Sequence, residues 1–204
     1  MAPLPFNMLG YIYESGLDSL RASFVSGSQG LRQKLEDTTK ALDDYQHSLR
    51  NGGEWIGERD PEEGYVIWDQ EQVFNFDIDA AHEAYGELRK AFAIAAYHYW
   101  ERSIRKYCKA QGGKHADLVT KALGEGFPIS SDLNRTHRLA NALKHNNDSS
   151  GKKLLDCWPE VFSSTFKQRK HMDWYSVVHL SDDQVHQAFD IILSSGPQRK
   201  LSGT

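Results

Sequence analysis

Leucine and aromatic residues recur every three or four positions near the start of the chain, which is the spacing of one face of an α-helix. This pattern predicts a helix over residues 17–50. The segment 26–30 is rich in serine and glycine and marks a point where this helix can divide in two. Asn51 and two glycines end it. The positions that define the pattern are Leu17, Leu20, Phe24, Leu31, Leu35, Leu42, Tyr45 and Leu49.

A second periodic stretch predicts the longest helix of the chain, from about residue 79 to residue 110. Asp77 or Asp79 would cap its N-terminus, and two glycines after Gln111 would stop it. Between the two helices, residues 52–77 mix glycine, proline and acids with aromatic residues. For this segment we expect an irregular connector with at most one short strand.

The second half of the chain consists of shorter periodic segments separated by turn residues. Gly124 closes the first of them, and Ser130 or Ser131 is placed to cap the second. Ser181-Asp-Asp183 is placed to cap the last. We expect helices over residues 115–123, 131–146, about 152–156 and 183–193, a short strand over residues 174–180, and fraying from residue 194 onward.

These elements predict an all-α fold, a helical bundle of about five to seven helices with small irregular or β additions. A chain of 204 residues is long enough to bury one good core, so one compact domain is expected overall. Within it, residues 1–78 would form a helical and irregular segment packed on the bundle. Residues 79–195 would form the bundle core, and residues 196–204 a frayed tail.

Net charge, hydropathy and cysteine content exclude some classes of function. The net charge of -4 and the isoelectric point near 6.1 argue against a generally basic, nucleic-acid-coating surface, so an RNA site would have to be a local basic patch. The chain shows no apolar run of membrane-spanning length and no signal-peptide pattern at its start. The two cysteines fit free thiols in a reducing compartment. We therefore expect a soluble, cytoplasmic protein that does not contact a membrane.

One helix carries the candidate chemistry. Arg138, Asn141 and His145 fall within about 60° of one another on the predicted helix, because each residue turns the helix by roughly 100°. Asn134 extends this stripe by one turn. A fixed guanidinium can hold a phosphate, and an imidazole can move a proton near neutral pH. The residues expected to bind flanking substrate are Asn134, Arg135, Lys144, Asn146, Lys152 and Lys153.

The long helix followed by Arg138, six residues and His145 resembles the HEPN superfamily (higher eukaryotes and prokaryotes nucleotide-binding domains). The resemblance covers roughly residues 80–162. In many members a polar residue directly follows the arginine, whereas here Leu139 does and Asn141 supplies the amide two residues later. Glu101 and Arg105 resemble a supporting acidic and basic element found in part of the superfamily.

What the resemblance implies is metal-independent RNA cleavage without a cofactor, often as a toxin or in phage defence, by a homodimer in which two motifs meet. His145 would take the proton of the 2′-hydroxyl or protonate the leaving oxygen, Arg138 would stabilise charge on the phosphate, and Asn141 would orient the histidine or bind a phosphate oxygen. A protein partner such as an antitoxin is also implied. The alternative is a catalytically inactive HEPN-like module that binds nucleotide or RNA or serves in protein assembly.

Structural explanations for the same residues remain open. Arg138 can pair with a carboxylate on another helix, and a histidine near a helix C-terminus is favoured by the helix dipole alone. We expect five other histidines to lie on the surface; they are His115, His137, His171, His179 and His186. No pattern of cysteines and histidines matches a metal site, and the Glu-x-x-His pairs of a di-metal bundle are absent.

Overall fold

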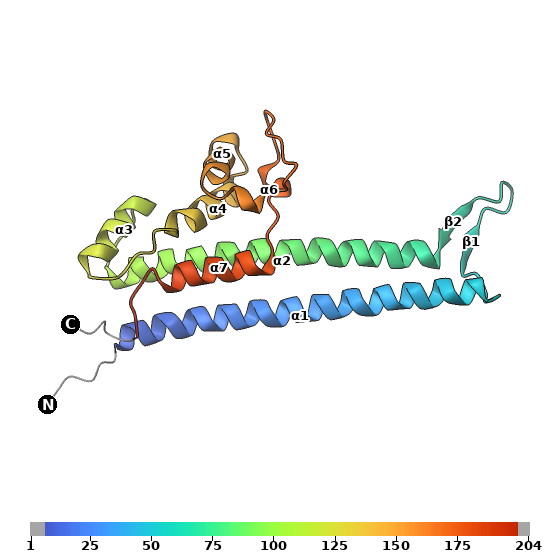
Figure 1. The fold of residues 1–204 in the computed structure, drawn as a ribbon, viewed down its shortest axis with the longest axis horizontal. Helices are drawn as coiled ribbons and strands as arrows, with labels where there is room; N and C mark the ends of the chain where they lie inside the picture. Colours follow the sequence, from blue (N-terminus) through green and yellow to red (C-terminus); the bar gives the residue numbers. More distant parts are fainter. Residues whose placement is uncertain (1–6, 200–204) are drawn as a thin grey trace. The chain divides into compact units, whose positions relative to one another are not determined.

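The computed structural model describes residues 7–199, and within them helices dominate (Figure 1). The all-α fold class is therefore confirmed. None of these helices combines the length and the apolar character that crossing a bilayer requires. The elements are α1 (Met8–Arg50), β1 (Gly57–Arg59), β2 (Val66–Asp69), α2 (Gln70–Tyr107), α3 (His115–Gly124), α4 (Leu133–His145), α5 (Asp148–Cys157), the 3-10 helix η1 (Pro159–Val161), α6 (Trp174–Val177) and α7 (Asp182–Leu193).

The chain forms two compact units, and the boundaries differ from the predicted ones. Within the described residues, the first unit comprises residues 7–24 and 89–199, and the second comprises Val25–Leu88. The predicted boundary between residues 78 and 79 falls inside α2. The long helices carry the chain from one unit into the other, so the composition changes at residue 78 without a break in structure.

The second unit contains the small sheet and corrects two predictions. β1 and β2 pair antiparallel, with Gly57 opposite Asp69. α2 then begins at Gln70, nine residues before the predicted start. The Asp69 carboxylate accepts the amide of Gln72 at 2.8 Å, and the Gln72 side chain accepts the amide of Asp69 at 3.2 Å. This reciprocal capping satisfies amides that would otherwise be unpaired and sets the start of the helix.

α1 is continuous through the serine- and glycine-rich segment where we expected a break. Ser28 is buried in this segment, and a Cβ on Gly27 would lie 3.3 Å from the Leu88 side chain. Each glycine weakens a helix by roughly 1 kcal/mol relative to alanine. Here the close packing of small residues against α2 outweighs that cost.

The core of the first unit is built from large aromatic side chains on several helices. Trp100 of α2, Trp158 and Trp174 are at most 1% exposed, and so is Phe189 of α7. α4 packs against α5, α6 and α7. Its buried face is formed by Leu133, Thr136, Leu139, Ala140, Ala142 and Leu143. The opposite face of α4, which carries the candidate residues, is therefore left toward solvent.

Two further predictions fail in the C-terminal part. Residues 174–177 are helical rather than extended, because the Asp173 carboxylate accepts the amides of Tyr175 and Ser176 and so starts a helical turn. Ser195, Gly196 and Pro197 are buried, and the Arg199 amide donates to Glu14 Oε1 at 2.6 Å. The described part of the predicted frayed tail is thus packed, and residues 200–204 lie outside the described residues.

Candidate functional site

α4 sets the positions of Arg138 and Asn141. Both side chains are half-buried, while Leu139 and Leu143 beneath them are almost fully buried. The apolar residues fix the rotation of the helix, since turning it would expose them. Arg138 and Asn141 are therefore held on the exposed side of a rigid element, and this agrees with the stripe predicted from the spacing.

Two histidines that we expected on the surface are stacked beside these residues. The rings of His115, at the start of α3, and His137, on α4, lie parallel, with centroids 3.9 Å apart and an interplanar angle of 8°. The Tyr97 hydroxyl of α2 is 3.1 Å from His115 Nδ1. Trp100 closes the inner side, with its ring centroid 5.5 Å from that of His115. Three helices thus converge on one ring cluster.

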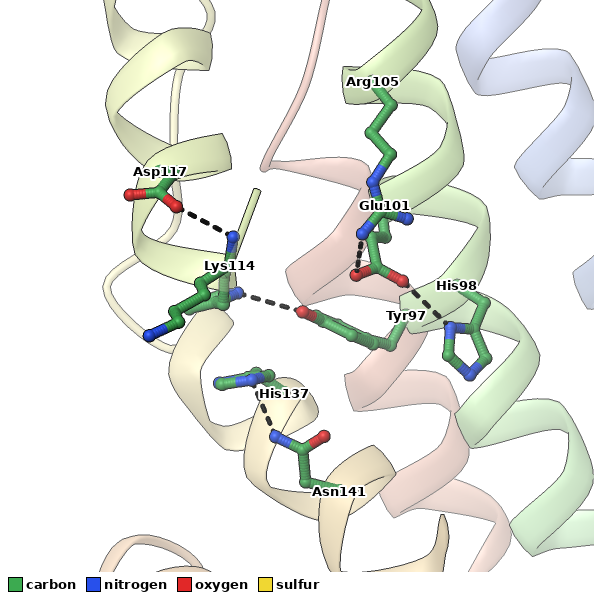
Figure 2. Close-up of polar contacts among 9 residues, drawn as sticks. Tyr97, His98, Glu101, Arg105, Lys114, Asp117, His137 and Asn141 are labelled. Carbon is green, nitrogen blue, oxygen red and sulfur yellow. Dashed lines mark hydrogen bonds and ion pairs between the residues drawn. The ribbon is translucent and has the colours of Figure 1, made fainter. Parts of the chain in front are cut away.

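Asn141 contacts His137 rather than His145. The Asn141 Nδ2 atom lies 2.7 Å from His137 Nε2, one helical turn away (Figure 2). With the amide as donor, His137 carries its own proton on Nδ1. That Nδ1 is buried and has no hydrogen-bond partner within residues 7–199. Asn141 therefore contacts His137 and not His145, the histidine that we expected it to orient.

Burial and positive charge keep both stacked rings neutral at pH 7. Burial, then His115, then Arg138 lower the pKa of His137 to about 4. Burial and then Arg138 lower the pKa of His115. Burial raises the pKa of Tyr97, and the Glu101 carboxylate adds to this, so its hydroxyl keeps its proton. A cationic guanidinium beside two uncharged imidazoles is what distinguishes this site.

Arg138 has no ion-pair or hydrogen-bond partner within the described part of the chain. Arg105 and Arg135 differ in this respect. The Arg105 guanidinium lies 2.8 Å from Glu101 Oε1, and the Arg135 Nε atom lies 3.3 Å from Asp132 Oδ1. The first structural explanation for Arg138, pairing with a carboxylate, therefore does not apply among residues 7–199. Its donors remain available to an anion.

Glu101 is an acidic residue whose charge acts on the ring cluster. Its carboxylate accepts from Arg105 at 2.8 Å and lies 3.2 Å from His98 Nδ1 (Figure 2). It also acts on Tyr97, His115 and His137, as their pKa shifts show. Glu101 and Arg105 thus form an ion pair beside the cluster, and Glu101 is committed to Arg105 rather than to Arg138.

His145 lies apart from the ring cluster, exposed in the last turn of α4. The helix ends at the next residue, because Asn146 adopts a left-handed conformation with φ 45°. The Asn146 side chain donates to Asp173 at 2.9 Å and accepts the amide of Tyr175 at 3.1 Å. These bonds give Asn146 a structural role, and they fix the end of the helix on which His145 is presented.

The other predicted substrate-binding residues lie at both ends of α4 and on α5. Asn134, Lys144 and Lys152 are exposed. Lys152 acts on the Asp148 carboxylate, whose pKa is lowered, chiefly by its bond from Trp174. It is the neighbouring Lys153 whose charge reaches His137. Of the two lysines, Lys153 is therefore the one whose charge acts on the ring cluster.

Sequence reasoning missed Tyr97, His115 and His137. A local signal existed for His137, since it is adjacent to Arg138 and one helical turn before Asn141. No local signal marked His115, because it lies on another helix and meets His137 only through the tertiary fold. The prediction that His115 and His137 are surface residues is wrong, since both are half-buried.

Charge divides between the two units. Residues 7–24 and 89–199 hold 18 lysines and arginines and 13 aspartates and glutamates, whereas residues 25–88 hold 5 and 15. The first unit is thus basic and the second strongly acidic, although the chain as a whole is mildly acidic. An anionic ligand would be drawn to the unit that contains Arg138 and the histidines.

The buried histidines predict a pH dependence of stability. The pKa of His137 is about 4 in the folded chain and about 6.5 when unfolded, so the unfolded chain binds the proton at higher pH. Its contribution to stability is complete above about pH 6.5 and is lost as the pH falls toward 4. We expect denaturant midpoints to fall over this range and to fall less steeply in His137→Gln, which keeps a partner for Asn141.

The matched control for this titration is His179→Gln, since His179 is exposed. This variant should keep the slope of the unaltered chain. An unchanged slope in His137→Gln would contradict the assignment of the proton uptake to His137.

Comparison with known proteins leaves the site to be interpreted from its own geometry. No protein-family model, curated protein or solved structure matches this chain.

Proposed function

We propose that this protein is a metal-independent endoribonuclease of the HEPN type, acting through Arg138 and His145. The observation that carries the proposal is the state of Arg138, a half-buried guanidinium with no carboxylate partner in residues 7–199. It lies on the same face of α4 as the exposed His145 and in the more basic unit. An arginine that is positioned but unpaired is suited to a phosphodiester.

The chemistry requires only groups that the chain supplies. His145 accepts the proton of a ribose 2′-hydroxyl, the 2′-oxygen attacks the phosphorus, and the bond from phosphorus to the 5′-oxygen breaks. Arg138 stabilises the added negative charge on the phosphate oxygens. The products are a 2′,3′-cyclic phosphate and a 5′-hydroxyl, and DNA is resistant because it lacks the nucleophile.

The proposal includes a homodimer. One exposed histidine can serve as base or as acid but not as both in the same step, and the leaving 5′-oxygen needs a proton. His145 of the partner subunit supplies that proton when two copies meet through the same surface. The resemblance extends the proposal to a role as a toxin or a phage-defence component held by a protein partner.

A second candidate is a catalytically inactive HEPN-like module that binds RNA or nucleotide or serves in protein assembly. The observation that favours it is that Asn141 is committed to His137. No residue within 7–199 is hydrogen-bonded to the His145 ring, so nothing in the single chain orients it. In this alternative, Arg138 binds the phosphate and no bond is cleaved.

Product chemistry tests the proposal. The purified chain is incubated with mixed cellular RNA in excess EDTA, and the new ends are identified by mass spectrometry. We expect 2′,3′-cyclic phosphate and 5′-hydroxyl ends, and intact DNA of the same sequence. Ends with a 3′-hydroxyl, or cleavage only after a divalent cation is added, would contradict the mechanism. Binding of RNA without any cleavage would favour the second candidate.

A further inference from the structure

Exposed apolar side chains of the described residues form two groups along the chain, and the larger group lies at the β-hairpin of the second unit. Residues 7–199 contain 11 large hydrophobic side chains that are exposed, and six of them fall within 21 consecutive residues. Single exposed hydrophobic residues are normal on a protein surface, but a local group of this kind marks an interaction site. We call this group the hairpin surface. It consists of Ile56 (47% exposed), Tyr65 (55%), Ile67 (49%), Trp68 (40%), Val73 (39%) and Phe76 (72%).

The hairpin itself is incompletely covered. Ile67 and Trp68 are successive residues of β2 and both are exposed, and a shift of register between Glu58 and Arg59 leaves Ile67 without a partner in β1. Within the described chain the sheet has two strands only, so each strand has an unpaired edge. A two-stranded sheet of three and four residues is marginal by itself in water, and a third strand is the simplest way to complete it.

α2 extends the hairpin surface beyond the sheet. Val73 and Phe76 are three residues apart in its first two turns and therefore share a face of the helix. Phe74, between them, turns the other way and meets Tyr45 of α1 with ring centroids 6.2 Å apart. Figure 1 shows β2 leading directly into α2, so strand and helix present their exposed residues from one continuous segment.

Charge identifies the kind of partner. Residues 54–79 contain nine aspartates and glutamates and a single basic residue, Arg59. An anionic lipid surface or a nucleic acid would be repelled by this segment. The same segment of a second copy would be repelled equally. If the hairpin surface bound the basic unit of another copy, the contact would join two different surfaces. Such head-to-tail contacts can repeat without closing and then produce filaments instead of a small oligomer.

From these observations we propose that the hairpin surface is a docking site for an extended, basic segment of a partner protein. The segment adds a third strand beside β2, with apolar side chains against the hairpin surface and lysines or arginines facing the surrounding carboxylates. Main-chain hydrogen bonds supply the affinity of such strand addition, and alternate side chains supply its specificity. The proposal does not depend on RNA cleavage, because it concerns the acidic unit alone.

The test uses the full chain and two fluorescein-labelled synthetic peptides, one alternating lysine and valine and one alternating glutamate and valine. Fluorescence anisotropy measures both affinities, and hydrogen exchange locates the bound peptide. We expect the lysine peptide to bind at least about tenfold more tightly, more weakly as salt rises, and to protect amides of residues 66–69. Ile67→Asn should weaken it by about tenfold, as should the joint change Glu62→Lys with Glu63→Lys.

The matched control is Leu123→Asn, which alters a side chain 57% exposed in the other unit and should leave the affinity unchanged. Circular dichroism checks that each variant is folded. Absent or equal binding of the two peptides, or protection confined to residues 89–199, would overturn the proposal. So would sedimentation showing that the chain self-associates and that Ile67→Asn abolishes this, because the occupant would then be a second copy.

Discussion

Replacing Arg138 by alanine is expected to lower the rate of RNA cleavage by about 100-fold or more. Removal of one preorganised donor to a developing oxyanion costs roughly this much in other enzymes. Arg138→Lys should recover part of the loss, because it keeps the charge and loses the planar fork. The initial rate on a labelled RNA in EDTA measures both effects.

Two measurements separate this loss from an effect on folding. Arg138 has no carboxylate partner in residues 7–199, so alanine leaves no buried charge uncompensated, and the unfolding midpoint should change little. Its charge lowers the pKa of His115 and of His137, so both values should rise in Arg138→Ala. Arg169→Ala, at an exposed position, is the control and should cleave at nearly the normal rate. An equal rate in Arg138→Ala would exclude the residue from the reaction.

Gly151→Ala is expected to destabilise the first unit by about 3 kcal/mol or more. A Cβ at this position would lie 1.8 Å from Trp174 Cδ2, far inside any contact distance. Trp174 is fully buried and its indole donates to Asp148 at 2.8 Å, so it cannot move without losing packing and a hydrogen bond. Chemical denaturation measures the loss.

The control for this substitution is Gly30→Ala, at a helical position where a new Cβ meets nothing within 4 Å. It should stabilise the chain by up to about 1 kcal/mol, because alanine favours a helix more than glycine does. If Gly151→Ala were as stable as the unaltered chain, α5 and α6 would not pack as described.

Elements with strong local signals could be predicted from the sequence. α7 begins where Ser181 and Gln184 form a capping box, and α3 ends at Gly124. The start of α2 was missed, although Asp69 and Gln72 form the same kind of cap, because the aromatic residues around them suggested an irregular connector. Residues 174–180 alternate like a strand, but the carboxylate of Asp173 starts a helical turn, and burial of Trp174 follows from it.

Only the part of the candidate site that lies on a single helix, α4, could be predicted from the sequence. Helical spacing placed Arg138 and Asn141 on one face of α4, where both side chains are half-buried. The stacked pair of His115 and His137 could not be predicted, since α3 meets α4 only after the chain has folded. The distribution of charge between the units could not be predicted either, because the net charge of -4 is the sum over a basic unit and an acidic one.

The most direct test of the central claim compares RNA cleavage by the unaltered chain, His145→Ala and His179→Ala in EDTA. The two histidines are both exposed, so neither substitution should affect folding, and any contaminating nuclease would be shared by all three preparations. We expect cleavage to disappear in His145→Ala alone. Equal cleavage by all three proteins would contradict the assignment of His145 and of the site.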